Sequence, residues 1–86
     1  MPVISRFFGL VVVMYYRDHD PPHFHVRYGE RQALVAILDL RLLAGTLPPR
    51  ALGLVMEWAS LHREALLENW ERARRGEPLR PIPPLE

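Results

Sequence analysis

The hydrophobic period of the sequence changes abruptly at Pro48-Pro49, and this change limits the folds that the chain can adopt. Before it, segments rich in β-branched and aromatic residues alternate with turn-prone positions, which is typical of β-strands. These segments are residues 3–8, 10–18, 23–28, 32–38 and a shorter one at 41–45. After it, apolar residues recur at helical spacing as far as Arg75, with Gly76 placed as a C-cap. The pattern predicts an α+β fold, with an antiparallel four- to five-stranded meander followed by one long C-terminal helix packed on one sheet face.

A chain of 86 residues has room for one domain with one modest core. We assign residues 1–76 to the meander and helix, and residues 77–86 to a tail that contains four prolines and cannot form regular structure. The tail is either free or extended across another surface. No apolar run approaches the ~20 residues that span a bilayer, the N-terminus lacks a signal-peptide pattern, and the chain has no cysteine. We therefore expect a cytoplasmic protein that does not engage a membrane.

The second and fourth predicted strands are apolar on both sides, as strands buried on both faces of a sheet would be. Val11 and Val13 alternate with Val12 and Met14, and residues 34–37 repeat the pattern. One helix covers only one sheet face, and an uncovered apolar face is an aggregation hazard in a monomer. We therefore predict a homodimer or a permanent partner protein on the second face. The alternative is that strand twist and the Pro-rich tail cover it.

Three of the four histidines fall within the stretch HDPPHFHVRYGE, residues 19–30. Alternate side chains of a strand point to opposite faces, so the polar set shares the face away from the core: His23, His25 and Arg27. An H-x-H pair on a strand is a two-ligand platform for zinc or another divalent metal. Asp18, Asp20 or His19 from the preceding loop can complete it, and our candidate metal ligands are His19, His23, His25 and Asp20. The alternative is a pair of structural or surface histidines without a metal.

The same histidines also suit catalysis without a metal. Histidine acts as a general acid or base near neutral pH, Arg27 can stabilise a phosphorane-like charge, and Tyr28 or Tyr16 can orient a base. Such a set would cleave RNA through the 2′-hydroxyl, and the candidate catalytic residues are His23, His25, Arg27 and Tyr28. Strand alternation opposes this grouping, since Tyr28 should point away from both histidines. The formal net charge of +1 also argues against a dedicated non-specific nucleic-acid binder.

Two polar residues, His62 and Asn69, fall near the centre of the apolar face of the predicted helix. Buried polar groups are normally hydrogen-bonded, because leaving them unpaired costs stability. These two are therefore either satisfied core residues or the lining of a pocket between helix and sheet, with Tyr15 or Tyr28 on the strand side.

Three blocks of the chain, MPVISRFFG, MYYRDHDPPHFHVRYGE and ALGLVMEWASLHREALLENWERARRGEPLRPIPPLE, resemble a bacterial family called domain of unknown function 4160. The most specific segments are PPHFH and the helix block EWASLHREALLENW, whereas LDLRLL lacks the Gly that members commonly place there. Members of the family are often encoded beside members of domain of unknown function 2442, in a pairing that resembles a toxin–antitoxin operon. The resemblance implies a protein partner and a toxin-like role, and it transfers no catalytic set.

Two classes of function follow from these observations. The first is an uncharacterised protein-interaction module, a toxin–antitoxin-like component that acts through a protein partner or a homodimer. The second is a toxin-like ribonuclease or a metal-binding protein that uses the cluster of His19, His23 and His25.

Overall fold

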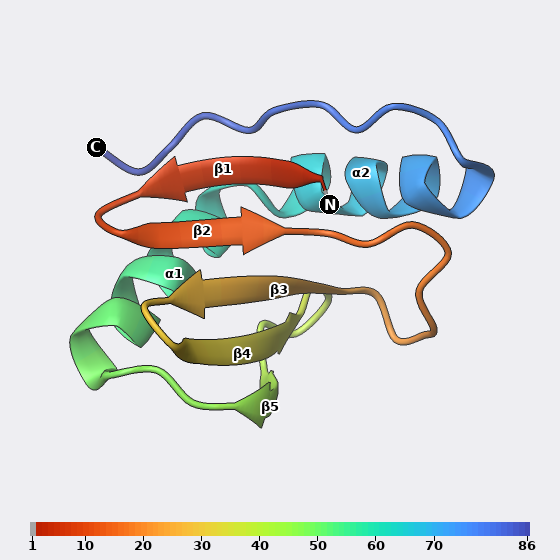
Figure 1. The fold of residues 1–86 in the computed structure, drawn as a ribbon. Coiled ribbons are helices and arrows are strands. Elements are labelled where there is room, and N and C mark those ends of the chain that lie inside the picture. The colour runs from red at the N-terminus through yellow and green to blue at the C-terminus, as the bar shows by residue number, and fades with distance from the viewer. Residues whose placement is uncertain (1) are drawn as a thin grey trace.

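Five strands precede two helices in the computed structural model, which describes residues 2–86. The strands are β1 (Val3–Phe7), β2 (Leu10–Val13), β3 (His23–Tyr28), β4 (Arg31–Ala36) and β5 (Leu42–Gly45). The helices are α1 (Pro49–Leu61) and α2 (Arg63–Arg75). The strands form one sheet, and both helices lie on the same side of it (Figure 1). This is the α+β class that the change of period predicts.

The sheet is an antiparallel meander in the order β1-β2-β3-β4-β5, so each strand pairs with its neighbours in sequence. Two of the connections are tight turns, which place consecutive strands side by side in antiparallel pairs. The β1–β2 turn contains Gly9 and the β3–β4 turn contains Gly29, with φ angles of 80° and 59° that residues with a side chain rarely adopt. The predicted meander is confirmed, including its short fifth strand.

The helical segment bends at His62, so the prediction of one long helix is wrong. His62 has φ −124° and ψ 27°, outside the helical region, and separates α1 from α2. Hydrogen bonds still cross the bend, since the His62 N–H donates to the carbonyl oxygens of Trp58 and Ala59, and the Leu66 N–H donates to that of His62. The His62 ring packs against the Trp58 indole, with ring centroids 5.7 Å apart. The spacing of apolar residues continues through the bend and therefore does not reveal it.

The outer ends of the helical segment agree with the sequence prediction. α1 begins at Pro49, whose missing N–H needs no partner in a first turn. α2 ends at Arg75 and is capped by Gly76, which adopts the left-handed conformation at φ 73°, while the N–H of Glu77 donates to the carbonyl oxygen of Arg72. No helix within residues 2–86 is long and apolar enough to cross a bilayer.

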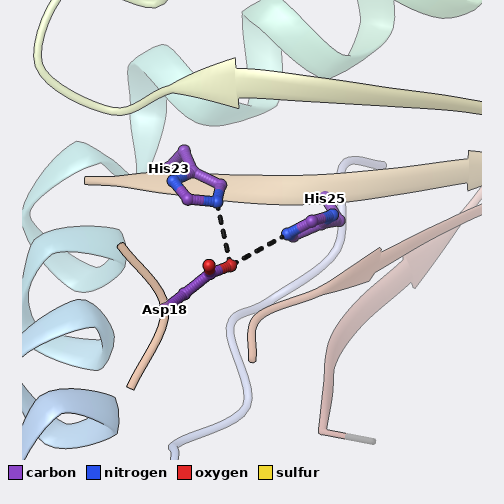
Figure 2. A group of neighbouring side chains, drawn as sticks. All are labelled: Asp18, His23 and His25. Atoms are coloured by element: carbon purple, nitrogen blue, oxygen red, sulfur yellow. Dashed lines mark hydrogen bonds and ion pairs between the residues drawn. The ribbon is translucent and has the colours of Figure 1, made fainter. Parts of the chain in front are cut away.

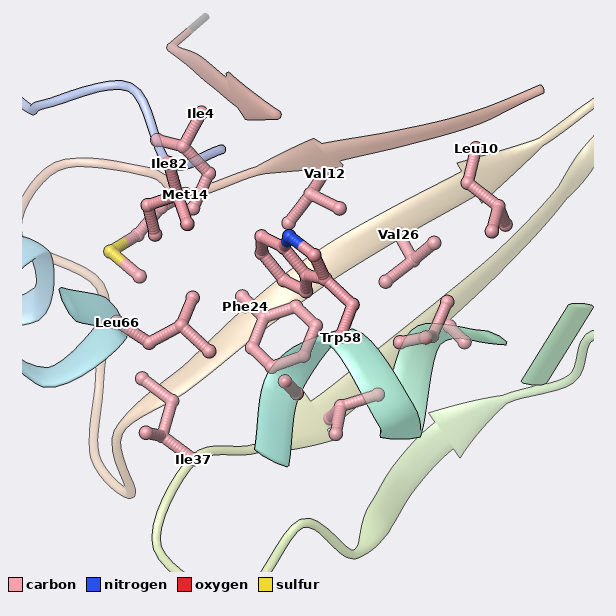
Figure 3. Close-up of a cluster of buried hydrophobic side chains, with 14 of the residues drawn as sticks. Ile4, Leu10, Val12, Met14, Phe24, Val26, Ile37, Trp58, Leu66 and Ile82 are labelled. Atoms are coloured by element: carbon pink, nitrogen blue, oxygen red, sulfur yellow. The ribbon is translucent and has the colours of Figure 1, made fainter. Parts of the chain in front are cut away.

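The core lies between the sheet and the helices, around Trp58 (Figure 3). Phe24 packs edge-on against the indole with centroids 5.9 Å apart, and the Phe7 ring lies 5.2 Å from it. Other fully buried positions on the facing surfaces are Val12, Val26, Val35, Val55 and Leu66. The inward orientation predicted for alternate residues of β3 is thus confirmed at Phe24 and Val26.

The Pro-rich tail, residues 77–86, runs extended beside β1 (Figure 1). Ile82 is buried in the core, and its N–H donates to the carbonyl oxygen of Ile4 at 2.8 Å. The indole Nε1 of Trp58 donates to the carbonyl oxygen of Pro83 at 2.9 Å. The tail is therefore fixed to both the edge strand and α1.

Asn69 is a satisfied core residue, and its partner is the tail. Its Nδ2 donates to the carbonyl oxygen of Arg80, and its Oδ1 accepts from the N–H of Arg80, both at 2.9 Å. A side-chain amide can make this pair of bonds because it carries a donor and an acceptor side by side, as the peptide group does. Of the two polar residues on the apolar helix face, Asn69 thus clamps the tail and His62 lies at the bend.

The sheet face away from the helices, called here the open sheet face, has no helix or loop across it within residues 2–86 (Figure 1). The strand register places two rows of side chains on it. One row contains Arg6, Val11, Arg27 and Gln32, and the other contains Val3, Val13, His25, Leu34 and Ala44. Val13 is buried beneath its neighbours, Val11 and Leu34 are half-buried, and Val3 is exposed. This face therefore mixes partly open apolar positions with polar ones.

Candidate functional site

Three side chains with metal-ligand chemistry converge where the chain passes from β2 into β3 (Figure 2). Asp18 lies in the loop between the two strands, and His23 and His25 lie on β3. The two imidazoles, two positions apart on an extended strand, lie with their ring centroids 5.1 Å apart. One ligand atom from each of the three residues lies within 4.8 Å of the other two.

His23 is almost completely buried, with 2% of its side chain exposed. Its ring packs against Trp70 of α2, with centroids 5.2 Å apart. Its Nδ1 lies 2.7 Å from the carbonyl oxygen of Pro21, and its Nε2 lies 3.0 Å from Oδ2 of Asp18. Because both ring nitrogens have partners, the orientation of the ring is fixed from two sides.

His25 directs its Nε2 to the same carboxylate oxygen, at 3.3 Å from Oδ2 of Asp18. Tyr15 packs edge-on against the His25 ring, with centroids 4.6 Å apart, and its hydroxyl accepts a 2.9 Å hydrogen bond from Nη2 of Arg27. The His25 and Asp18 side chains are 17% and 19% exposed. The cluster therefore opens to solvent at these two residues, beside a tyrosine and an arginine.

Burial and hydrogen bonding shift the ionisation of the cluster. Desolvation acts to raise the pKa of Asp18, but hydrogen bonds from the His19 backbone N–H and from His25, together with His23, outweigh it and lower that pKa. Burial lowers the pKa of His25, although the bond to Asp18 opposes this shift. At neutral pH the site therefore holds an Asp18 carboxylate and a neutral His25 imidazole, which are the protonation states that bind divalent cations.

The acid that meets the two histidines is Asp18, whereas Asp20, the acid among the candidate metal ligands, is exposed in the loop. His19 lies at the rim, with 81% of its side chain exposed and its Nε2 3.8 Å from Oδ1 of Asp18. Its ring centroid is 5.5 Å from that of His23. Asp18 and Asp20 flank His19 symmetrically in sequence, so only the path of the loop distinguishes them.

Tyr28 lies apart from the other candidate catalytic residues, as strand alternation predicts. It occupies the far end of β3 and, with Phe8, lines a pocket of about 250 Å³ beside the start of α1. Tyr15 instead lies beside His25 and Arg27. The antiparallel pairing of β2 with β3 brings Tyr15 there, and no local sequence pattern signals that contact.

The fold and the site define a small α+β protein whose five-stranded antiparallel meander carries an Asp-His-His cluster at one end. The chain belongs to the family described as Domain of unknown function (DUF4160), whose model matches residues 9–71. The match includes the loop and the strand that supply the cluster, and it confirms the family that the sequence blocks indicate. No curated protein and no solved structure matches the chain.

Proposed function

We propose that this protein is an interaction module that binds a partner protein through the open sheet face. The observation that carries the proposal is the one-sided packing of the fold. Both helices cover one face of the sheet and the tail lies along the β1 edge, which leaves the open sheet face to a partner. A chain of 86 residues buries only a modest core, and a partner on this face would extend it.

The composition of the open sheet face supports a protein partner. Val3, Val11 and Leu34 are partly exposed there, in rows that also contain Arg6 and Arg27. Protein interfaces combine an apolar centre with polar groups, and arginine is enriched in them. A partner surface with apolar side chains and acidic groups would complement this arrangement.

The product of a neighbouring gene is the partner that this proposal favours. The family resemblance pairs such chains with members of domain of unknown function 2442, in the manner of a toxin–antitoxin operon. Direct binding of one protein to the other is how such a pair would control activity. A toxin–antitoxin-like role therefore follows from the proposed interaction, and a homodimer through the same face is the alternative assembly.

Light scattering of the purified chain, alone and co-expressed with the neighbouring gene product, tests this proposal. Leu34→Arg should abolish association, because Leu34 is half-buried on the open sheet face. Leu61→Arg is the matched control, since Leu61 is 66% exposed at the end of α1 and lies away from that face. Monomers in both preparations, or equal association by the two variants, would contradict the proposal.

A toxin-like ribonuclease is a second candidate, favoured by the position of Arg27. Arg27 and Tyr15 lie beside His25 of the cluster, where an imidazole can move a proton and a guanidinium can stabilise a phosphorane-like charge. Expression of the chain should then arrest growth, and His25→Ala should relieve the arrest while His62→Ala does not. Arrest that survives His25→Ala would remove the cluster from the mechanism.

A further inference from the structure

Nδ1 of His23 lies 2.7 Å from the carbonyl oxygen of Pro21, and since a carbonyl oxygen can only accept, the tautomer that makes this hydrogen bond carries its hydrogen on Nδ1. A neutral imidazole has a single N–H, so Nε2 of neutral His23 presents a lone pair. This nitrogen is 3.0 Å from Oδ2 of Asp18, and a carboxylate also offers only lone pairs. Two acceptors therefore face each other at a histidine whose side chain is 2% exposed.

Nε2 of His23 and Oδ2 of Asp18 repel each other if both present lone pairs in a buried place. A positive charge between the two atoms removes this repulsion. A proton shared between Nε2 and Oδ2 would do so. A metal ion would instead use both lone pairs, and ligating histidines commonly donate their other ring N–H to a backbone carbonyl, as His23 does to Pro21. His25 directs its Nε2 to the same Oδ2, so that the same ion could take a third ligand there.

The two separations from the carboxylate oxygen of Asp18 to the imidazole nitrogens are compatible with a metal centre. Two ligands held ~2.0–2.1 Å from one ion at angles of about 90–110° lie roughly 2.9–3.4 Å apart. The two Nε2–Oδ2 separations are 3.0 and 3.3 Å. We propose that Asp18, His23 and His25 bind one divalent transition-metal ion through Oδ2 and the two Nε2 atoms. This site goes beyond the proposed partner binding, which uses the open sheet face and does not require a metal.

The donor set selects the class of metal. Two imidazoles and one carboxylate suit zinc, and also cobalt(II), nickel(II) or iron(II), whereas calcium and magnesium prefer oxygen ligands alone. Three protein ligands leave one position of a tetrahedral ion exchangeable, as in catalytic zinc sites. His25 and Asp18 are partly exposed, so water or a substrate can reach the cluster from solvent.

The surroundings hold the ligands in position without a metal. Oδ1 of Asp18 accepts the backbone N–H of His19 at 2.9 Å, which leaves Oδ2 for the ion. Trp70 packs against the His23 ring and Tyr15 against the His25 ring. Ligands that are fixed by packing and by outer hydrogen bonds bind metal with less loss of side-chain freedom.

Titration of the metal-stripped full chain with Zn²⁺ by calorimetry, and with Co²⁺ by visible absorption, tests this inference. We expect one ion per chain, and we expect His25→Ala and Asp18→Asn, which each remove a ligand, to weaken binding by more than the roughly 10–100-fold that loss of an outer hydrogen-bond partner costs. Both residues are partly exposed, so these variants should fold even if His23→Ala does not. His62→Ala is the matched control, because it removes a histidine outside the site and should leave affinity unchanged.

Thermal denaturation gives a second readout. Zn²⁺ should raise the Tm of the wild-type chain and of His62→Ala, but not that of His25→Ala, because only an ion bound to the folded state stabilises it. Absence of stoichiometric binding to the wild type, or wild-type affinity in both site variants, would overturn the inference.

Discussion

Replacing Asn69 by Ala should release the Pro-rich tail and destabilise the protein by about 2–3 kcal/mol. Asn69 is 1% exposed, and it makes two 2.9 Å hydrogen bonds with the backbone of Arg80. Each bond contributes about 0.5–1.5 kcal/mol net, and the small cavity left by the amide adds to the loss. A chain of this size has a total stability on the order of 5–15 kcal/mol, so this loss is a large part of it. For a domain of this length, such a loss should lower the Tm by roughly 10–20 °C.

Hydrogen exchange locates this effect in the tail. The N–H of Ile82, which donates to the carbonyl oxygen of Ile4, should exchange faster in Asn69→Ala than in the wild type. Ser60→Ala is the control, since it removes only an exposed bond to Glu57 and should change stability by less than about 0.5 kcal/mol. A similarly small change in Asn69→Ala, or unaltered exchange at Ile82, would refute the clamp.

Backbone, core and ionisation effects can each be measured by denaturation. Gly45→Ala should lower the free energy of unfolding by about 2 kcal/mol or more in excess of the loss in Gly29→Ala, although both glycines have positive φ. A Cβ at Gly45 collides with the carbonyl oxygen of Gln32, whereas one at Gly29 meets nothing within 4 Å, and equal losses would count against this reasoning. Trp58→Phe should cost about 1–3 kcal/mol in urea denaturation, because it removes the hydrogen bond to Pro83 and leaves space in the core, and a neutral result would exclude both contributions. Burial is the chief cause that lowers the pKa of His25 in the folded state below 6.5. As the pH falls, the unfolded chain therefore binds a proton at His25 before the folded chain does. The metal-free protein should lose stability as the pH falls from 6.5 toward the folded pKa. His25→Gln should flatten this dependence in thermal scans, and an unchanged slope would show that another group causes it.

The orientation of β3 could be predicted because strand alternation is a local property. Phe24 and Val26 face the core, and His25 faces the opposite side, as a period of two residues requires. The deep burial of His23 could not be predicted in this way. Trp70 of α2 covers its ring, and that contact joins residues far apart in the chain.

Three other features depend on the tertiary structure. Asp18 and Asp20 have the same chemistry on either side of His19, and only the loop conformation decides which carboxylate meets the cluster. The bend at His62 keeps the apolar spacing, and the N–H groups of His62 and Leu66 still make helical hydrogen bonds, so no sequence period marks it. Asn69 was identifiable as a polar residue on an apolar face, but its partner is the backbone of the tail, which has no side-chain signal.

The position of the ring proton on His23 tests the claim of a metal centre most directly. Heteronuclear NMR of the imidazole nitrogens, recorded on the metal-free chain near pH 8, assigns that proton to Nδ1 or Nε2. We expect Nδ1 to carry a proton bonded to Pro21, and the Nε2 resonance to shift when one equivalent of Zn²⁺ is added, because the ion then lies between Nε2 and Asp18. A proton on Nε2, with resonances unaffected by Zn²⁺, would contradict the claim that Asp18, His23 and His25 form a metal site.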